Sequence, residues 1–231
     1  MWPFTAKLAK TGFLTGFTDF HCHLLPGVDD GIKKMKDTLL MLGYYEEVGI
    51  REVWFTPHVM EDVPNTTEVL KNRFEEVKNE YQGGLKLHLA AEYMLDNVFE
   101  ERLAANDLLL HGDAQDQVLV ETSYFSGPMD LHDILKRIMA TGVFPLLAHP
   151  ERYVYMNNDE YRELREMGVR FQLNIPSICG MYGGYVFEKA RWLLENDMYD
   201  MIGSDTHRTS ARMGDFLIKR KLAEKMLECR S

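Results

Sequence analysis

Cysteine is scarce in this sequence, and its three cysteines, Cys22, Cys179 and Cys229, lie far apart. An odd number at this spacing forms neither a disulfide framework nor a zinc-finger pattern, so a reducing cytoplasm is the simplest location. Long apolar runs are lacking as well. No stretch approaches the roughly 20 apolar residues of a membrane-spanning helix, and lysines interrupt the segment where a signal peptide would lie.

Positive charge is in deficit. Lys and Arg number 26 against 36 Asp and Glu, which gives a formal net charge of −10. Such a field repels a polyanion, so a broad nucleic-acid interface is disfavoured. A small phosphorylated substrate stays compatible, because metal ions and local arginines can reverse the sign inside a pocket.

Low-complexity tracts and Pro/Ser-rich linkers are also missing, and 231 residues suffice for one α/β barrel or two small domains. What the sequence does contain is a repeated alternation of a short apolar run and a helix-like stretch. The expected strands are Gly16–His21, Glu52–Thr56, Leu85–Ala91, Gln117–Glu121, Phe144–Ala148, Val169–Asn174 and Met198–Gly203. The expected helices are Lys34–Val48, Thr66–Tyr81, Asn97–Ala105, Met129–Thr141, Asp159–Met167, Tyr185–Asn196 and Arg212–Cys229.

This alternation predicts a parallel sheet, because each helix returns the chain to the same end of the sheet. We expect an α/β fold in which about seven strands form a barrel, with a doubly wound open sheet as the alternative. A single domain would span residues 16–231 and follow an N-terminal extension at residues 1–15.

Side chains that can bind metal ions follow or end most of the expected strands. They are His21, His23, His58, Glu92, Glu121, His149, Asp205 and His207. In a barrel the carboxyl ends of all strands converge on one mouth, where active sites lie. The sequence therefore predicts that these distant residues meet in one metal centre.

Each feature alone has a plainer interpretation. His21 and His23 point to the same side of a strand, because side chains alternate, but such histidines also occur in packing or on the surface. Glu121 ends an apolar run, where a carboxylate is costly unless it is paired or bound to a metal, and it could equally be a strand-edge residue. Asp29 or Asp30 could cap the following helix or supply one more oxygen ligand. Their coincidence at strand ends favours the metal centre.

Nitrogen and oxygen donors suit manganese, iron, zinc or magnesium, and the carboxylates favour the harder metals. Five histidines, two glutamates, Asp205 and one of Asp29 or Asp30 are too many donors for one ion. We therefore expect two or three ions with a bridging carboxylate. Such clusters can generate hydroxide at neutral pH and hold both oxygens of a phosphoryl displacement.

The order of these residues resembles the PHP (polymerase and histidinol phosphatase) family. The resemblance is carried by His21-x-His23, Asp29-Asp30-Gly31, Thr56-Pro57-His58, Glu92, Glu121, His149-Pro150-Glu151-Arg152 and Asp205-x-His207. Within that family the segment Asp19–Gly31 is similar to the bacterial protein-tyrosine phosphatases of the CpsB/YwqE type, which accompany capsule and exopolysaccharide synthesis. The resemblance runs from about Gly16 to Arg212, and it departs from the family at Cys22, where Ser or Thr is more usual.

The resemblance implies a PHP fold, which is a distorted (β/α)7 TIM-like barrel, and a manganese centre. One ion would be bound by His21, His23, Glu92 and Asp205. Glu92 would bridge to a second ion, bound also by Glu121 and His149. A third would be bound by Asp30 or Asp29, His58 and His207. The catalytic residues would be Arg152, Arg212, His149 and Asp205.

The two arginines would bind the phosphate, since a guanidinium donates two parallel hydrogen bonds. Without the resemblance, Arg152 could be a solvated loop residue and Arg212 an ordinary residue of a first helical turn. Candidate substrate contacts are Tyr124, Phe125, Tyr153 and Tyr155, for which loop packing is the alternative.

The implied activity is a metal-dependent protein-tyrosine phosphatase in which a metal-activated hydroxide attacks phosphorus in line. No Cys-x5-Arg loop of the thiol phosphatases exists, because Val28 lies six residues past Cys22 and Tyr185 six past Cys179. The implied partner is the phosphotyrosine tail of a bacterial tyrosine autokinase. The alternatives are another PHP phosphoesterase, such as a histidinol phosphatase or a nuclease, and a non-catalytic metal-binding partner protein.

Overall fold

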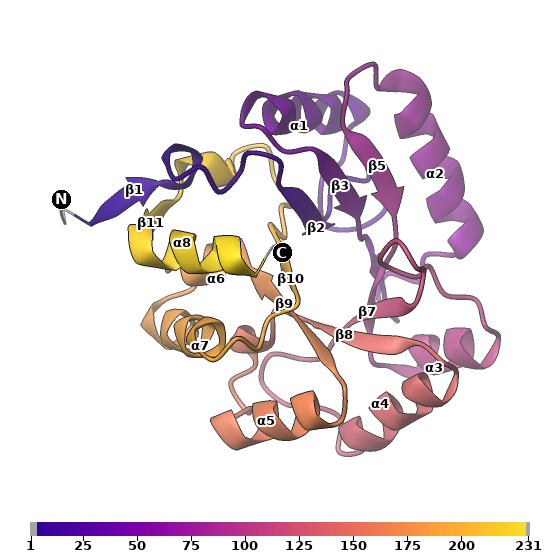
Figure 1. Ribbon diagram of the computed structural model, residues 1–231. Coiled ribbons are helices and arrows are strands. Elements are labelled where there is room, and N and C mark those ends of the chain that lie inside the picture. Colours follow the sequence, from indigo (N-terminus) through magenta and orange to yellow (C-terminus); the bar gives the residue numbers. More distant parts are fainter. Residues whose placement is uncertain (1–3, 230–231) are drawn as a thin grey trace.

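Parallel strands form the centre of the molecule, which the computed structural model describes for residues 4–229 (Figure 1). The strands are β2 (Thr18–Cys22), β3 (Glu52–Phe55), β4 (His58–Val59), β5 (Lys86–Leu89), β6 (Glu92–Met94), β7 (Gln117–Glu121), β8 (Phe144–Ala148), β9 (Arg170–Asn174) and β10 (Met201–Gly203). One sheet has the order β10-β9-β8-β7-β6-β4 and the other β2-β3-β5. All their pairs are parallel, which confirms the expected α/β class.

The two sheets are continuous with each other at both ends. The chain passes from β3 into β4 through Thr56 and Pro57, and the backbone N–H of Glu92 donates to the carbonyl oxygen of Pro57 at 3.0 Å. Beyond β10, the backbone N–H of Asp205 donates to the carbonyl oxygen of His21 in β2 at 2.7 Å. The strands therefore form a curled parallel sheet with their carboxyl ends on the same side.

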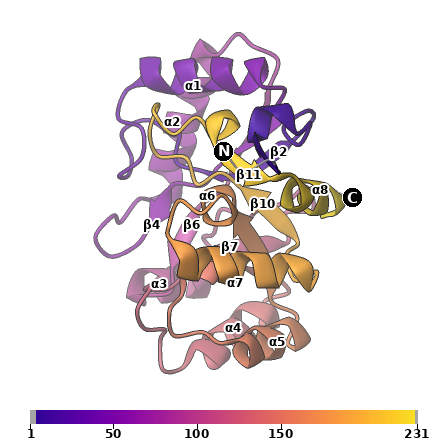
Figure 2. The same cartoon turned by 90° about the vertical axis from the view of Figure 1, so that its left-hand side faces the viewer.

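Helices lie around the outside of this sheet (Figure 1). They are α1 (Met35–Glu47), α2 (Thr67–Glu80), α3 (Asn97–Ala104), α4 (Leu131–Ala140), α5 (Asn158–Glu166), the short α6 (Ile175–Ile178), α7 (Gly184–Glu195) and α8 (Arg220–Glu228). Polar caps define several starts: Asp96 accepts from the backbone N–H of Phe99 at α3, and Asn157 forms a capping box with Glu160 at α5. Figure 2 shows α7 on one side of the molecule, between α1 and the pair α4 and α5.

The central strands are buried on both faces. In β7, Val118 and Val120 belong to the large core between sheet and helices, whereas Leu119 packs on the other face with Leu146 and Ala148. Strands that are covered on both sides are typical of parallel sheets, and they appear in a sequence as continuous apolar runs. This burial explains why β7 and β8 begin and end at the expected residues.

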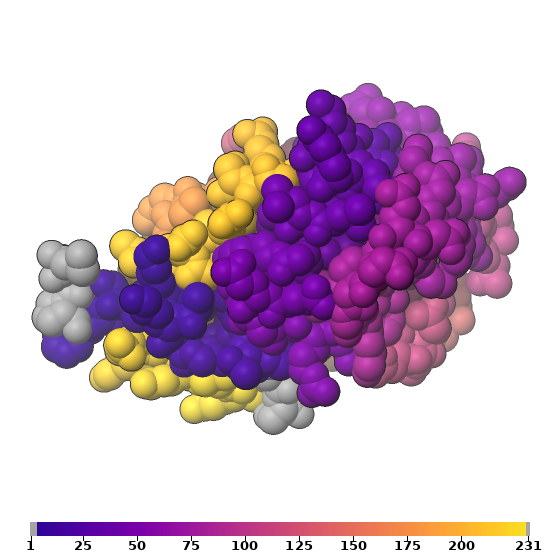
Figure 3. Space-filling model, turned by 90° about the horizontal axis from the view of Figure 1, so that it is seen from above, coloured from indigo at the N-terminus to yellow at the C-terminus, as the bar shows by residue number. Residues whose placement is uncertain are grey.

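The prediction of one helix over Arg212–Cys229 is wrong in its first half. That segment contains a 3-10 turn at Met213–Asp215 and the strand β11 (Leu217–Lys219) before α8 begins at Arg220. β11 pairs with β1 (Thr5–Lys7), a strand in the expected N-terminal extension, and the pairing sets Ala6 opposite the buried Ile218. Figure 3 shows the N-terminal segment, in indigo, against the C-terminal one, in yellow. Local propensity cannot reveal a pairing between the two ends of the chain.

Another 3-10 turn, Leu8–Lys10, follows β1, and a third, Pro150–Arg152, follows β8. Within residues 4–229, no helix is long and apolar enough to cross a bilayer. Residues 1–3 of the expected extension and residues 230–231 of the expected domain lie outside the described residues.

Candidate metal centre

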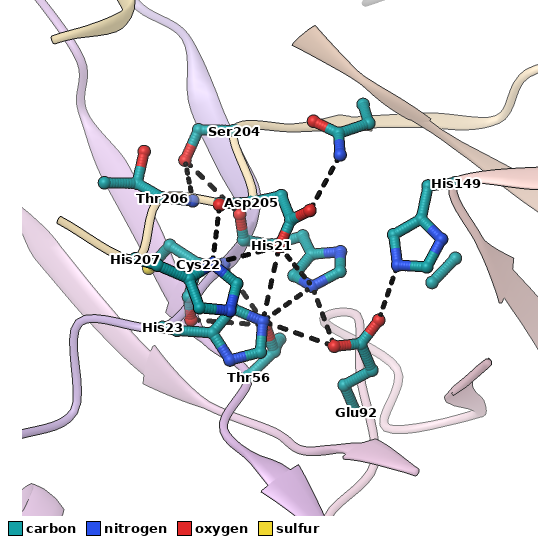
Figure 4. Close-up of polar contacts among 12 residues, drawn as sticks. His21, Cys22, His23, Thr56, Glu92, His149, Ser204, Asp205, Thr206 and His207 are labelled. Carbon is teal, nitrogen blue, oxygen red and sulfur yellow. Dashed lines mark hydrogen bonds and ion pairs between the residues drawn. The ribbon is translucent and has the colours of Figure 1, made fainter. Parts of the chain in front are cut away.

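The histidines and acids predicted at strand ends meet at the carboxyl side of the sheet (Figure 4). His21 lies in β2, His58 begins β4, Glu92 begins β6 and Glu121 ends β7. The others, His23, His149, Asp205 and His207, lie in the turns after β2, β8 and β10. The sequence pattern predicted that these residues converge, and their side chains lie close together in the structure.

Glu92 lies at the middle of the cluster. Its Oε2 is 3.2 Å from Nε2 of His21, from Nε2 of His23 and from Nδ1 of His58. Its Oε1 is 3.0 Å from Nε2 of His149. Burial raises the pKa of the Glu92 carboxyl, but the imidazoles of His21 and His58 outweigh it and hold this pKa well below its usual range. A carboxylate in this position can bridge neighbouring cations.

Three overlapping groups of side chains could hold metal ions, each with its ligand atoms within 4.8 Å of one another. The groups are His21, His23 and Glu92; His58, Glu92 and Glu121; and His23, Asp30, His58 and His207. The shared members mean that two or more ions would lie close together.

The cluster also contains buried polar atoms without hydrogen-bond partners in the described part of the chain: Nδ1 of His58, Oε2 of Glu92 and Oε1 of Glu121. An unsatisfied buried polar group costs about 1–3 kcal/mol, and such groups are rare in native proteins. The His58 atom is 3.1 Å from the Glu121 atom and 3.2 Å from the Glu92 atom. A cation among them would satisfy all three atoms, so these residues fit a metal centre.

Two histidines are oriented by hydrogen bonds on their outer nitrogens. Nδ1 of His21 donates to Oε1 of Gln172 at 2.8 Å, and Nδ1 of His23 donates to Oδ2 of Asp29 at 2.8 Å. In the neutral form, each ring would therefore present an unprotonated Nε2 to the cluster, which is how metal-binding histidines are usually held. Gln172 was missed in the sequence analysis, although a glutamine inside the apolar run of β9 was a signal.

Asp29 and Asp30 have different surroundings. Asp29 is buried, and it also accepts from the backbone N–H groups of Gly31 and His58 at 2.9 and 3.1 Å. Burial raises its pKa, but hydrogen bonding to His23 and the backbone outweighs this and lowers the pKa to about 2. Asp30 instead points to the cluster rim, with Oδ1 3.3 Å from Nε2 of His207 and 3.6 Å from Nε2 of His58. Asp30 thus belongs by geometry to a group of side chains that could hold a metal ion, whereas Asp29 bonds to His23.

His149 and Asp205 both adopt the left-handed backbone region, with φ of 34° and 52°. Residues other than glycine seldom do so, and the cost is of order 1–3 kcal/mol each. Asp205 is held there by its backbone hydrogen bond to His21, and His149 faces Glu92. Because this strain falls on two candidate ligands, we infer that the local backbone is maintained for the direction in which it points their side chains.

Arg152 lies beside the cluster. Its Nη1 donates to Oδ2 of Asp205 at 3.0 Å, and Nδ2 of Asn174 donates to the same oxygen at 2.8 Å. The guanidinium lies between two aromatic rings, 4.1 Å from the centroid of Tyr124 and 4.5 Å from that of Tyr182. Tyr182 belongs to the loop after α6, a segment to which the sequence assigned no role.

A cavity of about 550 Å³ opens next to the cluster, and Tyr124, Arg152 and Arg208 are among its lining residues. Arg208 was not a candidate, although it directly follows His207. Arg212 does not line this cavity, because its guanidinium is exposed and lies 5.0 Å from the ring centroid of Tyr44.

The remaining expected aromatic contacts lie elsewhere. Phe125 lines an adjoining cavity. Tyr153 is fully buried and donates to the carbonyl oxygen of Ala148, and the hydroxyl of Tyr155 bonds with Thr122. Tyr153 and Tyr155 do not line the main cavity and are packing residues here.

The chain is similar in sequence to several known proteins. The chain is 29% identical over 207 residues to the tyrosine-protein phosphatase CpsB of Streptococcus pneumoniae, which covers 84% of each chain. It is 27% identical over 205 residues to the tyrosine-protein phosphatase YwqE of Bacillus subtilis, covering 84% of this chain and 78% of that one. The putative tyrosine-protein phosphatase CapC of Staphylococcus aureus is 24% identical over 216 residues, with 91% and 84% covered.

A solved structure is similar as well. It comes from a crystallographic study of YwqE from Bacillus subtilis and CpsB from Streptococcus pneumoniae, described as unique metal-dependent tyrosine phosphatases. The TM-score is 0.75 at 25% identity, over 92% of this chain and 86% of that one. Residues 17–229 match the family described as capsular polysaccharide synthesis, CpsB/CapC. The chain therefore belongs to the CpsB/CapC family.

Proposed function

We propose that this protein is a metal-dependent protein-tyrosine phosphatase. The observation that carries the proposal is the buried Glu92 carboxylate, shared by His21, His23, His58 and His149 beside an arginine-bearing cavity. The similarity to relatives named tyrosine-protein phosphatases supports the same activity. Acting on a phosphate monoester is compatible with the acidic chain, because Arg152 and the metal ions supply positive charge locally.

The finer fold that we propose is a distorted (β/α)7 barrel of the PHP type, formed by residues 16–231. Two connections between the sheets support a closed ring of strands: the chain passes directly from β3 into β4, and the backbone of Asp205 hydrogen-bonds to that of His21. Residues 1–15 would be an extension that joins the body of the domain through β1 and β11.

We assign the metal ligands by geometry and resemblance together. They are His21, His23, Asp30, His58, Glu92, Glu121, His149, Asp205 and His207. Asp29 is placed behind His23 rather than in the ligand set. Manganese is the metal that we propose, as two or three ions, because the donors are nitrogen and oxygen only and rich in carboxylate.

The bound ions would supply Lewis-acid activation of a water molecule for in-line attack on phosphorus. Arg152 would bind the phosphate through Nε and Nη2, since Nη1 is engaged by Asp205 and no hydrogen bond from the other two is found within residues 4–229. Tyr124 would form a wall for the phenyl ring. The phenol of tyrosine has a pKa near 10, so its phenolate is a good leaving group, and a histidine of the cluster or a water molecule there would donate the proton that the phenolate takes up.

The second proposed phosphate ligand is Arg212. For this role its guanidinium has to leave the ring of Tyr44 and turn toward the cavity, which Arg208 already lines. His149 and Asp205 complete the proposed catalytic set, because both line the cavity and face the cluster.

The partner that we propose is the phosphotyrosine tail of a bacterial tyrosine autokinase in capsule or exopolysaccharide synthesis, and the location is cytoplasmic. The family description and the three free cysteines support this setting. Nucleic acid is disfavoured by the charge of −10.

The test is phosphate release from a phosphotyrosine peptide by purified protein, first with EDTA and then with manganese restored. Activity is expected to disappear with EDTA, to return with manganese, and to be absent in His149→Ala. Leu40→Gln, an exposed change on α1, is the control for a silent substitution. Turnover by fully metal-stripped protein would contradict the mechanism, and turnover of histidinol phosphate or DNA in place of the peptide would contradict the substrate.

A further inference from the structure

A second cavity of about 460 Å³ adjoins the candidate active site. It shares Asp30, His58 and Tyr124 with the main cavity, so the two cavities adjoin at these side chains. Besides Glu121, Thr122 and Ser123, the second cavity is lined by four apolar residues of its own: Met60, Val63, Met94 and Phe125. We call these four residues the apolar shelf.

The apolar shelf has a fixed backbone. Met60 and Val63 exchange two backbone hydrogen bonds, at 3.1 Å from Met60 N–H and 2.9 Å from Val63 N–H. Met94 ends β6, and the backbone N–H of Phe125 donates to Oγ of Ser123 at 3.3 Å. The unbranched methionine side chains can adapt to different partners on this base.

The apolar shelf is not covered by the protein itself. Phe125 is 79% exposed, which is unusual for a phenylalanine. Met60, Val63 and Met94 are only partly buried. Exposed apolar side chains gathered beside a functional site mark a surface that binds a partner or ligand.

The charges around the apolar shelf restrict which side chains of a partner can bind there. The turn between Met60 and Val63 carries the exposed acids Glu61 and Asp62, and Asp30 lies at the shared edge. None of the residues that line this cavity is an arginine or lysine. An acidic side chain placed here would be repelled, whereas an apolar one would gain contact area.

We propose that the apolar shelf binds an apolar side chain next to the phosphotyrosine of a polypeptide substrate. This inference rests on the proposed function and deepens it, because it defines the substrate class by its flanking residue. The main cavity of about 550 Å³ would accommodate the phosphotyrosine side chain, and the adjoining second cavity is left for the neighbouring residue. The enzyme would then prefer apolar-flanked sites to acidic-flanked ones.

The test compares three phosphotyrosine peptides of equal length, with leucine, serine or glutamate on both sides of the phosphotyrosine. Free phosphotyrosine serves as the substrate that has no flanking residues. We expect kcat/KM for the leucine peptide to exceed that for the glutamate peptide by about tenfold or more, which is the range an apolar pocket achieves. Phe125→Gln and Met94→Gln should bring this ratio toward one, and a uniform change in activity would not affect it because the ratio compares two peptides on the same enzyme.

Leu40→Gln, the same type of change on the exposed face of α1, is the matched control and should keep the full preference. If the three peptides react at equal rates and free phosphotyrosine is also turned over, the proposed binding role of the apolar shelf is wrong, whereas the proposed phosphatase activity is retained. A preference that survives Phe125→Gln and Met94→Gln together would also overturn it. No turnover of free phosphotyrosine or of any of the three peptides by metal-loaded protein would remove the proposed function and this inference with it.

Discussion

The guanidinium of Arg152 donates to Oδ2 of Asp205 at 3.0 Å, which ties a phosphate-binding candidate directly to a metal-ligand candidate. The rings of Tyr124 and Tyr182 enclose the same guanidinium. The arginine is therefore held in one orientation before substrate arrives, so little entropy is lost when phosphate binds.

Removing the Tyr182 ring should loosen Arg152. Tyr182→Ala is expected to raise KM for phosphotyrosine by about 3- to 10-fold with a smaller change in kcat, the size of a partly buried cation–π contact. Tyr182→Phe should retain the parental KM, because it keeps the ring. Steady-state kinetics on free phosphotyrosine measure both. If Tyr182→Ala has the same effect in an Arg152→Ala background, the ring does not act through Arg152.

The two other arginines near the cavity can be separated by phosphate inhibition. Arg208→Ala is expected to raise the inhibition constant of inorganic phosphate several-fold, because Arg208 lines the cavity. A charge-assisted hydrogen bond contributes about 1.5–3 kcal/mol, or roughly 10- to 150-fold, and the solvent exposure of Arg208 reduces this contribution. Arg212→Ala reports on a different event. If Arg212→Ala raises the inhibition constant of phosphate as much as Arg208→Ala does, Arg212 leaves the ring of Tyr44 when phosphate binds. An unchanged inhibition constant would contradict the proposed role of Arg212 as a phosphate ligand.

Gln172 should control metal affinity without binding metal itself. It accepts from Nδ1 of His21, and loss of such a supporting partner typically lowers metal affinity about 10- to 100-fold. Gln172→Leu is expected to show this loss when manganese is titrated into metal-free protein and activity is followed. Gln172→Glu keeps an acceptor for His21 and is the matched control. Equal affinities in the parent protein and Gln172→Leu would contradict the supporting role.

His111 should make the fold sensitive to acid. Its ring is fully buried against Trp54, and burial lowers its pKa to about 3, although Nε2 donates to the carbonyl oxygen of Phe20 at 2.8 Å. The unfolded chain has the ordinary histidine pKa near 6.5, so below that pH the unfolded state binds more protons than the folded one. Stability contributed by this group is complete above about pH 6.5 and is lost as pH falls toward 3.

The slope of the unfolding free energy should approach about 1.4 kcal/mol per pH unit for this one group within that window. Urea unfolding of the parent and of His111→Gln, from pH 7 to pH 4, measures the difference between the two slopes. The variant should be less sensitive to acid, even where its absolute stability is lower. Parallel profiles would mean that His111 is already protonated in the folded protein.

The sequence predicted the strands and the convergence of ligand candidates well, because both depend on local pattern. A buried run such as β7 is apolar throughout, and a ligand such as Glu121 follows it directly. Asp29 and Asp30 could not be told apart, since they are the same residue type in one turn and only burial separates them.

Other features depend on contacts between distant segments. The strand around Ile218 pairs with the strand that contains Ala6, which lies far away in the sequence. The support of His21 by Gln172 and the position of Arg208 at the cavity likewise follow from packing between strands and loops. Arg212 was assigned by resemblance, which carries no information on where its side chain points.

The ligand candidates extend from β2, near the start of the chain, to the turn after β10, and this has a consequence for synthesis. A nascent chain that has emerged from the ribosome as far as His149 carries most of the imidazoles but lacks Asp205 and His207. Copies that end before Asp205 are therefore expected to lack phosphatase activity. The full set of ligand candidates is present only once the chain has been translated past its last parallel strand.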